Sequence, residues 1–324
     1  MRGLYGFLDL LTGYQGAAVL TAAWRLGVFG LLADEALTSE EVASRLRADP
    51  RSVDALLGAL ASLGAIERDG GRYRSSAFAR EHLREGAELG LVIEKEAVFA
   101  RAWLELESVV RTGRPVLAPW PERLRTEPER ARSFLEALAV LARLTGPDVA
   151  SLAELRTDGR ILDVGGGIGP YTRALVEAGR TVVLVELPVV AVWARESLAD
   201  LPGDRCEVVA ADVVAEGLPP VLEGSARALV SHVLHDLEPA SCVRLLDAVR
   251  RALAPGGVVV VNEFARDAAP GTFGPFFDVM MRVETGGSAY SVKELLGFLA
   301  EAGFVGPRRL EADPPITLLA ATRP

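Results

Sequence analysis

The sequence RILDVGGGIGP, residues 160–170, decides the fold of the second half of the chain. Its first five residues predict a buried strand, its glycines a tight turn, and Pro170 the start of a helix. Glycine lets a backbone turn sharply and approach a ligand closely, while proline suits the first turn of a helix. The stretch therefore predicts a strand–loop–helix whose helix N-terminus is directed at a bound molecule. A purely structural turn is the alternative.

Strands and helices alternate from this loop to the end of the chain. Helices are predicted over 170–179, 188–201, 239–253 and 291–302. The predicted strands are 160–164, 181–187, 206–212, 226–234, 257–263 and 316–322. This alternation is typical of a doubly wound, Rossmann-like α/β sheet that is mostly parallel and has an antiparallel last strand.

Helical spacing of apolar residues predicts helices in the first part of the chain, over 4–33 and 51–64. Thr38 or Ser39 can cap a further helix between them. Residues 65–74 alternate around an Asp-Gly-Gly turn, which predicts a β-hairpin. A helix–turn–helix followed by a two-stranded wing is the pattern of a winged-helix domain.

These patterns divide the chain into three parts. A winged-helix domain occupies 1–88, a helical connector 89–155 and the α/β domain 156–324. Glycine and proline break the helices of the connector at 113–115 and 119–121.

Two acidic residues stand at the ends of the next predicted strands. Glu186 follows the glycines by about 20 residues, where an acidic side chain binds ribose hydroxyls, and Asp212 can reach an adenine amino group. Pro170 takes the sixth place of a dinucleotide fingerprint, so the loop suits a nucleoside without a pyrophosphate better than NAD. Each acid alone can instead cap a helix or face solvent. The predicted contacts of the nucleoside are Asp163, Gly165, Gly167, Glu186, Leu187, Asp212, Val213 and Ser231.

Composition argues against several classes of protein. A net charge of −9 over 324 residues disfavours binding to nucleic acid through its phosphates. The two cysteines, Cys206 and Cys242, lack the CxxC spacing of a disulfide framework or a zinc site. The sequence has no signal-peptide pattern and no apolar run long enough for a membrane span. A cytoplasmic protein that binds neither nucleic acid nor membrane is therefore expected.

Over nearly the whole chain these motifs resemble those of the plant-type O-methyltransferases and their bacterial relatives. Besides the winged-helix region, the matching stretches are Asp163 to Gly169, Glu186 to Val190, Ala211-Asp212, Leu234-His235-Asp236, Pro255-Gly256-Gly257, Glu263, Gly286-Gly287 and Ala302-Gly303-Phe304. The resemblance implies S-adenosyl-L-methionine as methyl donor, S-adenosylhomocysteine as product and a small, usually aromatic, acceptor. It also implies a homodimer formed through the N-terminal domain, with a segment near the N-terminus reaching the partner's substrate pocket.

The resemblance further implies that His235 is the general base for the acceptor hydroxyl and that Glu263 orients it. Imidazole titrates near neutrality, so it can remove the proton of a phenol as the oxygen attacks a methyl group. In the alternative readings, His235 caps the helix that begins near Pro239 and Glu263 is an exposed loop acid. His232 is expected on the strand as a packed residue. Because no carboxylate spacing supports a metal site at the two histidines, no metal is expected.

Two positions depart from the family pattern. Ala289 stands where the family has a second glutamate, and Leu237 where tryptophan commonly follows His-Asp. Either Glu263 suffices, or the acceptor is not an ordinary phenol. The expected acceptor contacts, which helical spacing also permits as plain core residues, are Phe134, Leu138, Phe277 and Met281.

The leading hypothesis is O-methylation of a hydroxylated aromatic or polyketide-like molecule. Methyl transfer to carbon or nitrogen, and a relative of the same fold that no longer methylates, stay open. A winged-helix regulator with a ligand-sensing domain is disfavoured, because its recognition helix, 51–64, offers only Arg51 for reading bases.

Overall fold

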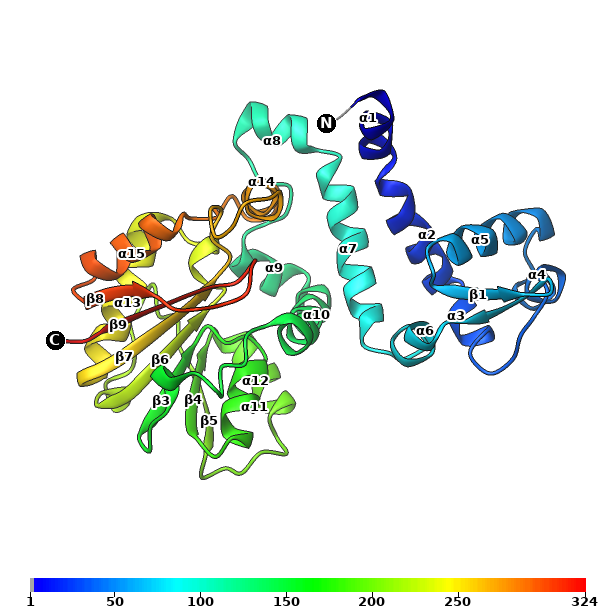
Figure 1. The fold of residues 1–324 in the computed structure, drawn as a ribbon. Coiled ribbons are helices and arrows are strands. Elements are labelled where there is room, and N and C mark those ends of the chain that lie inside the picture. The colour runs from blue at the N-terminus through cyan, green and yellow to red at the C-terminus, as the bar shows by residue number, and fades with distance from the viewer. Residues whose placement is uncertain (1–2) are drawn as a thin grey trace. The chain divides into compact units, whose positions relative to one another are not determined.

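The computed structural model describes residues 3–324. They form two compact units that divide after Arg101, and the course of each can be followed in Figure 1. Within these residues, every helix is too short or too polar to span a bilayer.

The first unit begins with three helices in the region 4–33, where the sequence predicts continuous helix. They are α1 (Gly3–Thr12), α2 (Tyr14–Arg25) and α3 (Val28–Leu31). Gly27 interrupts the helical path between α2 and α3 with a left-handed φ of 73°, which glycine adopts without strain.

Side-chain caps define the next two helices. Thr38 precedes α4 (Ser39–Leu46) and forms a capping box in which its side chain accepts from the Glu41 amide and the Glu41 side chain accepts from the Thr38 amide. Asp49 precedes α5 (Pro50–Ser62) and accepts from the Ser52 amide across 2.8 Å. The sequence predicts Thr38 as one of two candidate caps, whereas it does not predict the Asp49 cap.

A hairpin completes the winged-helix arrangement, as predicted. Strands β1 (Ile66–Asp69) and β2 (Arg72–Ser75) pair antiparallel through a turn whose glycines, Gly70 and Gly71, both have positive φ. Helix α6 (Ala77–His82) follows. The core of this unit joins the hairpin to α2–α5 and includes Val28, Leu57 and Tyr73.

Four α-helices follow α6 in the sequence before the strands of the sheet begin: α7 (Leu89–Trp103), α8 (Leu106–Thr112), α9 (Trp120–Thr126) and α10 (Pro128–Thr145). The predicted break at 113–115 follows the end of α8, whereas the one predicted at 119–121 is the start of α9, where Pro119 is the N-cap and Pro121 lies in the first turn. Pro128 begins α10, where its missing N–H costs nothing.

Seven strands of the described chain form one sheet in the order β5-β4-β3-β6-β7-β9-β8. They are β3 (Arg160–Val164), β4 (Thr181–Glu186), β5 (Cys206–Ala210), β6 (Ser225–Ser231), β7 (Leu253–Glu263), β8 (Val305–Arg309) and β9 (Thr317–Thr322). Only β9 runs against its neighbours, which confirms the predicted, mostly parallel sheet with an antiparallel last strand. Strand order reverses between β3 and β6, and such a switch point opens a ligand crevice at the carboxyl ends of the strands.

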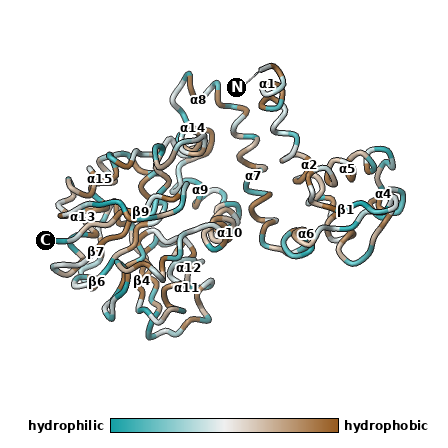
Figure 2. The backbone as a smooth tube through the Cα atoms, in the orientation of Figure 1, coloured by the Kyte–Doolittle hydropathy of each residue, from teal (hydrophilic) through white to brown (hydrophobic). Residues whose placement is uncertain are grey.

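Helices cover both faces of this sheet. The helices are α11 (Pro170–Glu177) and α12 (Pro188–Ser197) on one face, and α13 (Pro239–Ala252) and α15 (Val292–Glu301) on the other. Side chains alternate accordingly along each strand: Ile161 packs with α11, whereas Leu162 packs with α13. Figure 2 shows the apolar residues gathered along the strands between these two helical layers.

The structure corrects three predictions for this unit. The third strand ends at Ala210 rather than 212, and the fourth ends at Ser231 rather than 234. His232 therefore lies beyond the strand, with a left-handed φ of 55°. Edge strand β8 was not predicted, because its residues are mostly exposed and include Gly306 and Pro307. Helix α14 (Phe273–Glu284) carries two of the expected acceptor contacts, Phe277 and Met281.

Candidate active site

The loop after β3 forms a cradle of bare backbone. Gly165, Gly167 and Gly169 have φ values of 72°, 60° and 86°, in the left-handed region that favours glycine. A Cβ added to Gly165 would lie 2.6 Å from Val233 Cγ2, and one added to Gly166 would touch the carboxylate of the strand residue beneath it. No larger side chains fit these positions, so the backbone itself is what a bound molecule would meet.

Glu186 secures this loop from the end of β4. Its Oε1 accepts from the Gly167 amide across 3.2 Å, and its Oε2 accepts from the Leu187 amide across 2.5 Å. Burial raises the pKa of Glu186 to about 7. The predicted ribose-binding acid thus lies directly against the predicted glycine loop.

Asp163, at the base of the cradle, is fully buried and lacks part of its hydrogen bonding. Thr172 Oγ1 donates to Asp163 Oδ2 across 2.7 Å, whereas Oδ1 has no partner within residues 3–324. Burial raises the pKa of this carboxyl to about 6. A buried acceptor without a donor indicates that a group from outside the described chain, such as a ligand or water, completes the site.

Asp212 lies two residues beyond the end of β5. Its Oδ1 accepts from the amides of Val214 and Ala215 across 3.2 and 3.0 Å, and its Oδ2 makes no hydrogen bond with the described residues. The neighbouring Val213 is buried. Ser231 ends β6, next to β3 at the switch point, and its Oγ accepts from Asn262 Nδ2 across 2.9 Å.

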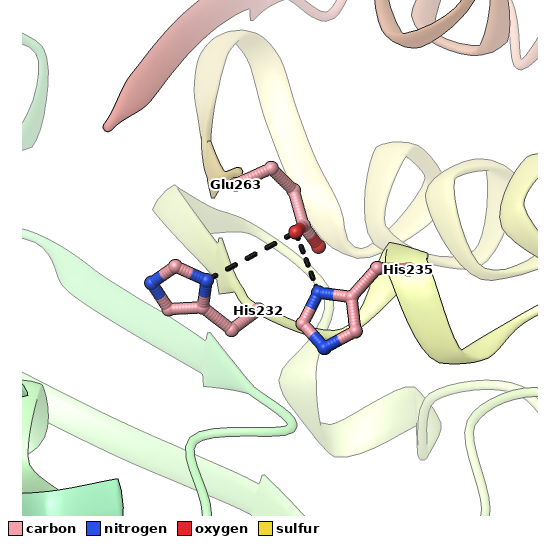
Figure 3. Close-up of side chains that lie close together, drawn as sticks. All are labelled: His232, His235 and Glu263. Atoms are coloured by element: carbon pink, nitrogen blue, oxygen red, sulfur yellow. Dashed lines mark hydrogen bonds and ion pairs between the residues drawn. The ribbon is translucent and has the colours of Figure 1, made fainter. Parts of the chain in front are cut away.

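His235 and Glu263 form a close pair, as Figure 3 shows. His235 Nδ1 lies 2.7 Å from Glu263 Oε2, while Glu263 Oε1 accepts from the Leu234 amide, also across 2.7 Å. Glu263 is 2% exposed at the end of β7, so it is not an exposed loop acid. Glu238, rather than His235, is the N-cap residue of α13.

Neighbouring acids favour the protonated form of His235. Burial alone lowers its pKa, but the charges of Glu263 and Asp236 outweigh that effect and raise the pKa to about 9. The same attraction holds the pKa of Glu263 below its usual range despite burial. At neutral pH the pair is therefore the Glu263 carboxylate beside the His235 imidazolium.

His232 lies beside this pair. Its Nε2 is 3.2 Å from Asn262 Nδ2, and its Nδ1 is 4.0 Å from Glu263 Oε2 (Figure 3). Burial lowers the pKa of His232 to about 4, so this ring is neutral at ordinary pH. The sequence offered no carboxylate for the two histidines, yet ligand atoms of both and of Glu263 lie within 4.8 Å of one another. His235 Nδ1 and Glu263 Oε2 nevertheless satisfy one another through their hydrogen bond.

One of the predicted acceptor contacts, Phe277, lies next to His235, and a second, Met281, packs with it. The ring of Phe277, on α14, stands edge-on 5.2 Å from the His235 ring. Met281 packs with Phe277 and with Ala289, so the alanine that replaces the family's second glutamate is part of an apolar cluster. Phe134, on α10, instead contacts the Trp120 ring at 5.5 Å, and Leu138 is 38% exposed.

A second buried pair of charges was missed by sequence reasoning. Arg123 on α9 and Glu284 on α14 form an ion pair of 3.1 Å, and 161 positions separate them in the sequence. No local pattern connects residues so far apart.

Family models cover most of the chain. The O-methyltransferase domain matches residues 103–305, and the O-methyltransferase dimerisation domain matches residues 8–85. The chain belongs to the O-methyltransferase family. The expected resemblance is thereby confirmed.

Several known proteins are similar to this chain along most of their length. The 3-hydroxy-5-methyl-1-naphthoate 3-O-methyltransferase of Streptomyces sahachiroi is 33% identical over 311 residues, which are 91% of this chain and 88% of that one. The N,N-dimethyltransferase OxyT of Streptomyces rimosus is 32% identical over 316 residues, 92% and 89% of the two chains. The structure of PigF with SAH matches with a TM-score of 0.88 and 26% identity over all of both chains.

This methyltransferase uses S-adenosylmethionine, as expected. The cradle fits that molecule. Glycine backbone lines it, and no residue of the described chain donates to the buried Asp163 Oδ1. Human N-acetylserotonin methyltransferase in complex with SAM shares the fold, with a TM-score of 0.84 and 24% identity over 98% of this chain and 97% of that one.

Proposed function

We propose that this methyltransferase methylates a hydroxyl group of an aromatic or polyketide-type small molecule, with His235 as general base. The observation that carries the proposal is the 2.7 Å contact between His235 Nδ1 and Glu263 Oε2. When bound, S-adenosylmethionine supplies an electrophilic methyl group on a sulfonium. The chain supplies orientation and a place for the proton.

The proton transfer follows from the state of His235. Because Glu263 occupies Nδ1, the remaining Nε2 is the atom that faces the acceptor and takes its proton. Asp236 Oδ2 is 3.8 Å from Nε2, too far for a hydrogen bond, so it leaves this nitrogen available. The imidazolium that forms is stabilised by the charges of Glu263 and Asp236, which outweigh burial and raise the pKa of His235 to about 9. Because only a neutral imidazole can take the acceptor's proton, His235 must lose its own proton before the reaction begins.

The donor would be held by the residues at the carboxyl ends of β3–β6. The Gly165 and Gly167 backbone would contact it most closely, Glu186 would bind the ribose and Asp212 Oδ2 the adenine amino group. The other proposed contacts of the donor are Asp163, Leu187, Val213 and Ser231.

We assign dimerisation to residues 1–88, a share of the acceptor pocket to 89–155 and donor binding to 156–324. The naphthoate-methylating relative supports an aromatic acceptor. The similarity to OxyT favours one second candidate, methyl transfer to nitrogen.

Incubation with isotopically labelled donor and a panel of phenolic, amine and carbon acceptors tests this function. We expect label on the oxygen of a hydroxylated aromatic, identified by mass spectrometry. Label only on nitrogen would replace the proposal by the second candidate, and label on carbon would refute both.

A further inference from the structure

The ion pair of Arg123 and Glu284 takes no part in the proton transfer proposed above. Its side chains are only 12% and 5% exposed. The guanidinium carbon of Arg123 lies 4.4 Å from the centre of the Trp120 ring and 5.0 Å from that of Phe134. These rings cover its flat surface, so its edge is the part left for hydrogen bonds.

The ion pair lies close to the proposed base. Thr285, which follows Glu284, donates to Asp236 Oδ1 across 3.0 Å, and Asp236 adjoins His235. Phe277, two turns earlier on the same helix, packs against the His235 ring. Helix α14 thus brings both the aromatic wall and the buried carboxylate to the acceptor side of the base.

Stability does not explain a buried pair of this kind. Removing two charges from water costs about as much as their attraction returns, so apolar residues would serve a purely structural role as well. Arg123 Nε and Nη2 and Glu284 Oε2 make no hydrogen bond with residues 3–324, and none of these atoms is enclosed. The pair therefore presents a donor and an acceptor side by side to accessible space.

We propose that Arg123 and Glu284 bind a keto–hydroxyl edge of the acceptor. Arg123 would donate to the keto oxygen, and Glu284 Oε2 would accept from the adjacent hydroxyl. Because the pair is neutral as a whole, it suits a neutral edge with one acceptor and one donor better than a carboxylate. This inference rests on the proposed function, since it concerns the same acceptor site.

Binding measurements on the full chain saturated with S-adenosylhomocysteine test the inference without turnover. The probes are a dihydroxyanthraquinone, whose keto oxygens adjoin hydroxyls, and the matching dihydroxyanthracene, which lacks keto oxygens. We expect the wild type to bind the anthraquinone about tenfold more tightly, as one charge-assisted hydrogen bond allows. In Arg123→Met/Glu284→Met, which removes both charges together, this ratio is expected to fall to about one.

A matched control is Arg308→Met/Glu154→Met, which removes the ion pair between β8 and the turn before β3. It is expected to keep the wild-type ratio. An unchanged ratio in Arg123→Met/Glu284→Met, or no preference in the wild type, would overturn the inference. Should the double variant fold poorly, Arg123→Gln/Glu284→Gln keeps two polar side chains but removes the charged donor to the keto oxygen, so it is also expected to lower the ratio. Preferential binding of the anthraquinone without methylation of any acceptor would refute the proposed function and leave the subsite standing.

Discussion

The three histidines of this chain differ sharply in their surroundings. His235 is buried against a carboxylate, His232 is neutral beside it, and His82 lies on α6 in the first unit. Histidine can therefore be replaced at the proposed active site, at His235, and at a position in the other unit, at His82, and the two variants can be compared.

His235→Ala is expected to slow methyl transfer by roughly 10²–10⁴-fold, the usual contribution of a general base. Binding of S-adenosylmethionine, measured by calorimetry, is expected to stay nearly unchanged because His235 makes none of the proposed donor contacts. His82→Ala is the control and is expected to keep wild-type rates. A wild-type rate in His235→Ala would remove the general-base role.

The pKa of His235 predicts a pH dependence. Only the neutral ring accepts a proton, so kcat/KM is expected to rise with pH as the group with a pKa of about 9 loses its proton. Glu263→Gln removes the negative charge that favours the protonated ring, which lowers this pKa and moves the rise in kcat/KM to lower pH. Rate profiles of both proteins between about pH 6 and 10 measure the shift. A rise at the same pH in both would contradict the assignment.

At the scale of single elements, the strand–loop–helix at 160–177 depends on backbone conformation. Gly165→Ala adds a Cβ that meets Val233 and also forces alanine to a φ of 72°. Gly217→Ala has the same backbone strain, at a φ of 81°, with nothing within 4 Å of the new Cβ. Both variants are expected to lose about 1 kcal/mol of stability through strain.

Only Gly165→Ala is expected to weaken donor binding, because its Cβ also displaces the loop that forms the cradle. Thermal unfolding and calorimetric titration with S-adenosylmethionine separate the two effects. Equal donor affinity in both alanine variants would mean that the loop does not hold the donor.

The spacing of apolar residues predicted the buried strands well. It gave a wrong strand end where the apolar residue that follows a strand is buried as part of another element. Leu234 reads as part of the fourth strand, but it is buried in a short turn of helix that begins beyond His232. Strand β8 has little apolar character because it lies at the edge of the sheet. The glycine loop, Glu186 and Asp212 could be predicted to lie together because the carboxyl ends of parallel strands meet at one edge of the sheet. The ion pair of Arg123 and Glu284 depends on tertiary packing, which spacing does not reveal.

At the scale of the whole molecule, the first helix points to association. Helix α1 has no buried residue, and its apolar side chains are largely exposed, including Tyr5 at 84% and Leu10 at 64%. Exposed apolar surface of this kind marks an interaction site, and the dimerisation domain, which begins at residue 8, includes the second half of this helix.

Sedimentation analysis at micromolar concentration is expected to show a homodimer. Leu11→Glu places a charge in the exposed apolar surface of α1 and is expected to shift the population toward monomer. Val221→Glu is the matched control, since Val221 is also exposed but lies in the second unit, and it is expected to stay dimeric. A wild-type monomer would contradict the assigned role of the first domain.

Helix α14 has a consequence for how such enzymes diversify. Three of the side chains proposed to recognise the acceptor, Phe277, Met281 and Glu284, lie on this one helix, whereas the proposed donor contacts lie between 163 and 231. Mutations in this segment can alter the range of acceptors while natural selection keeps the donor site intact. Gene duplication followed by change in twelve residues would then yield a new specificity with the old chemistry, and exchange of α14 between relatives should transfer acceptor preference.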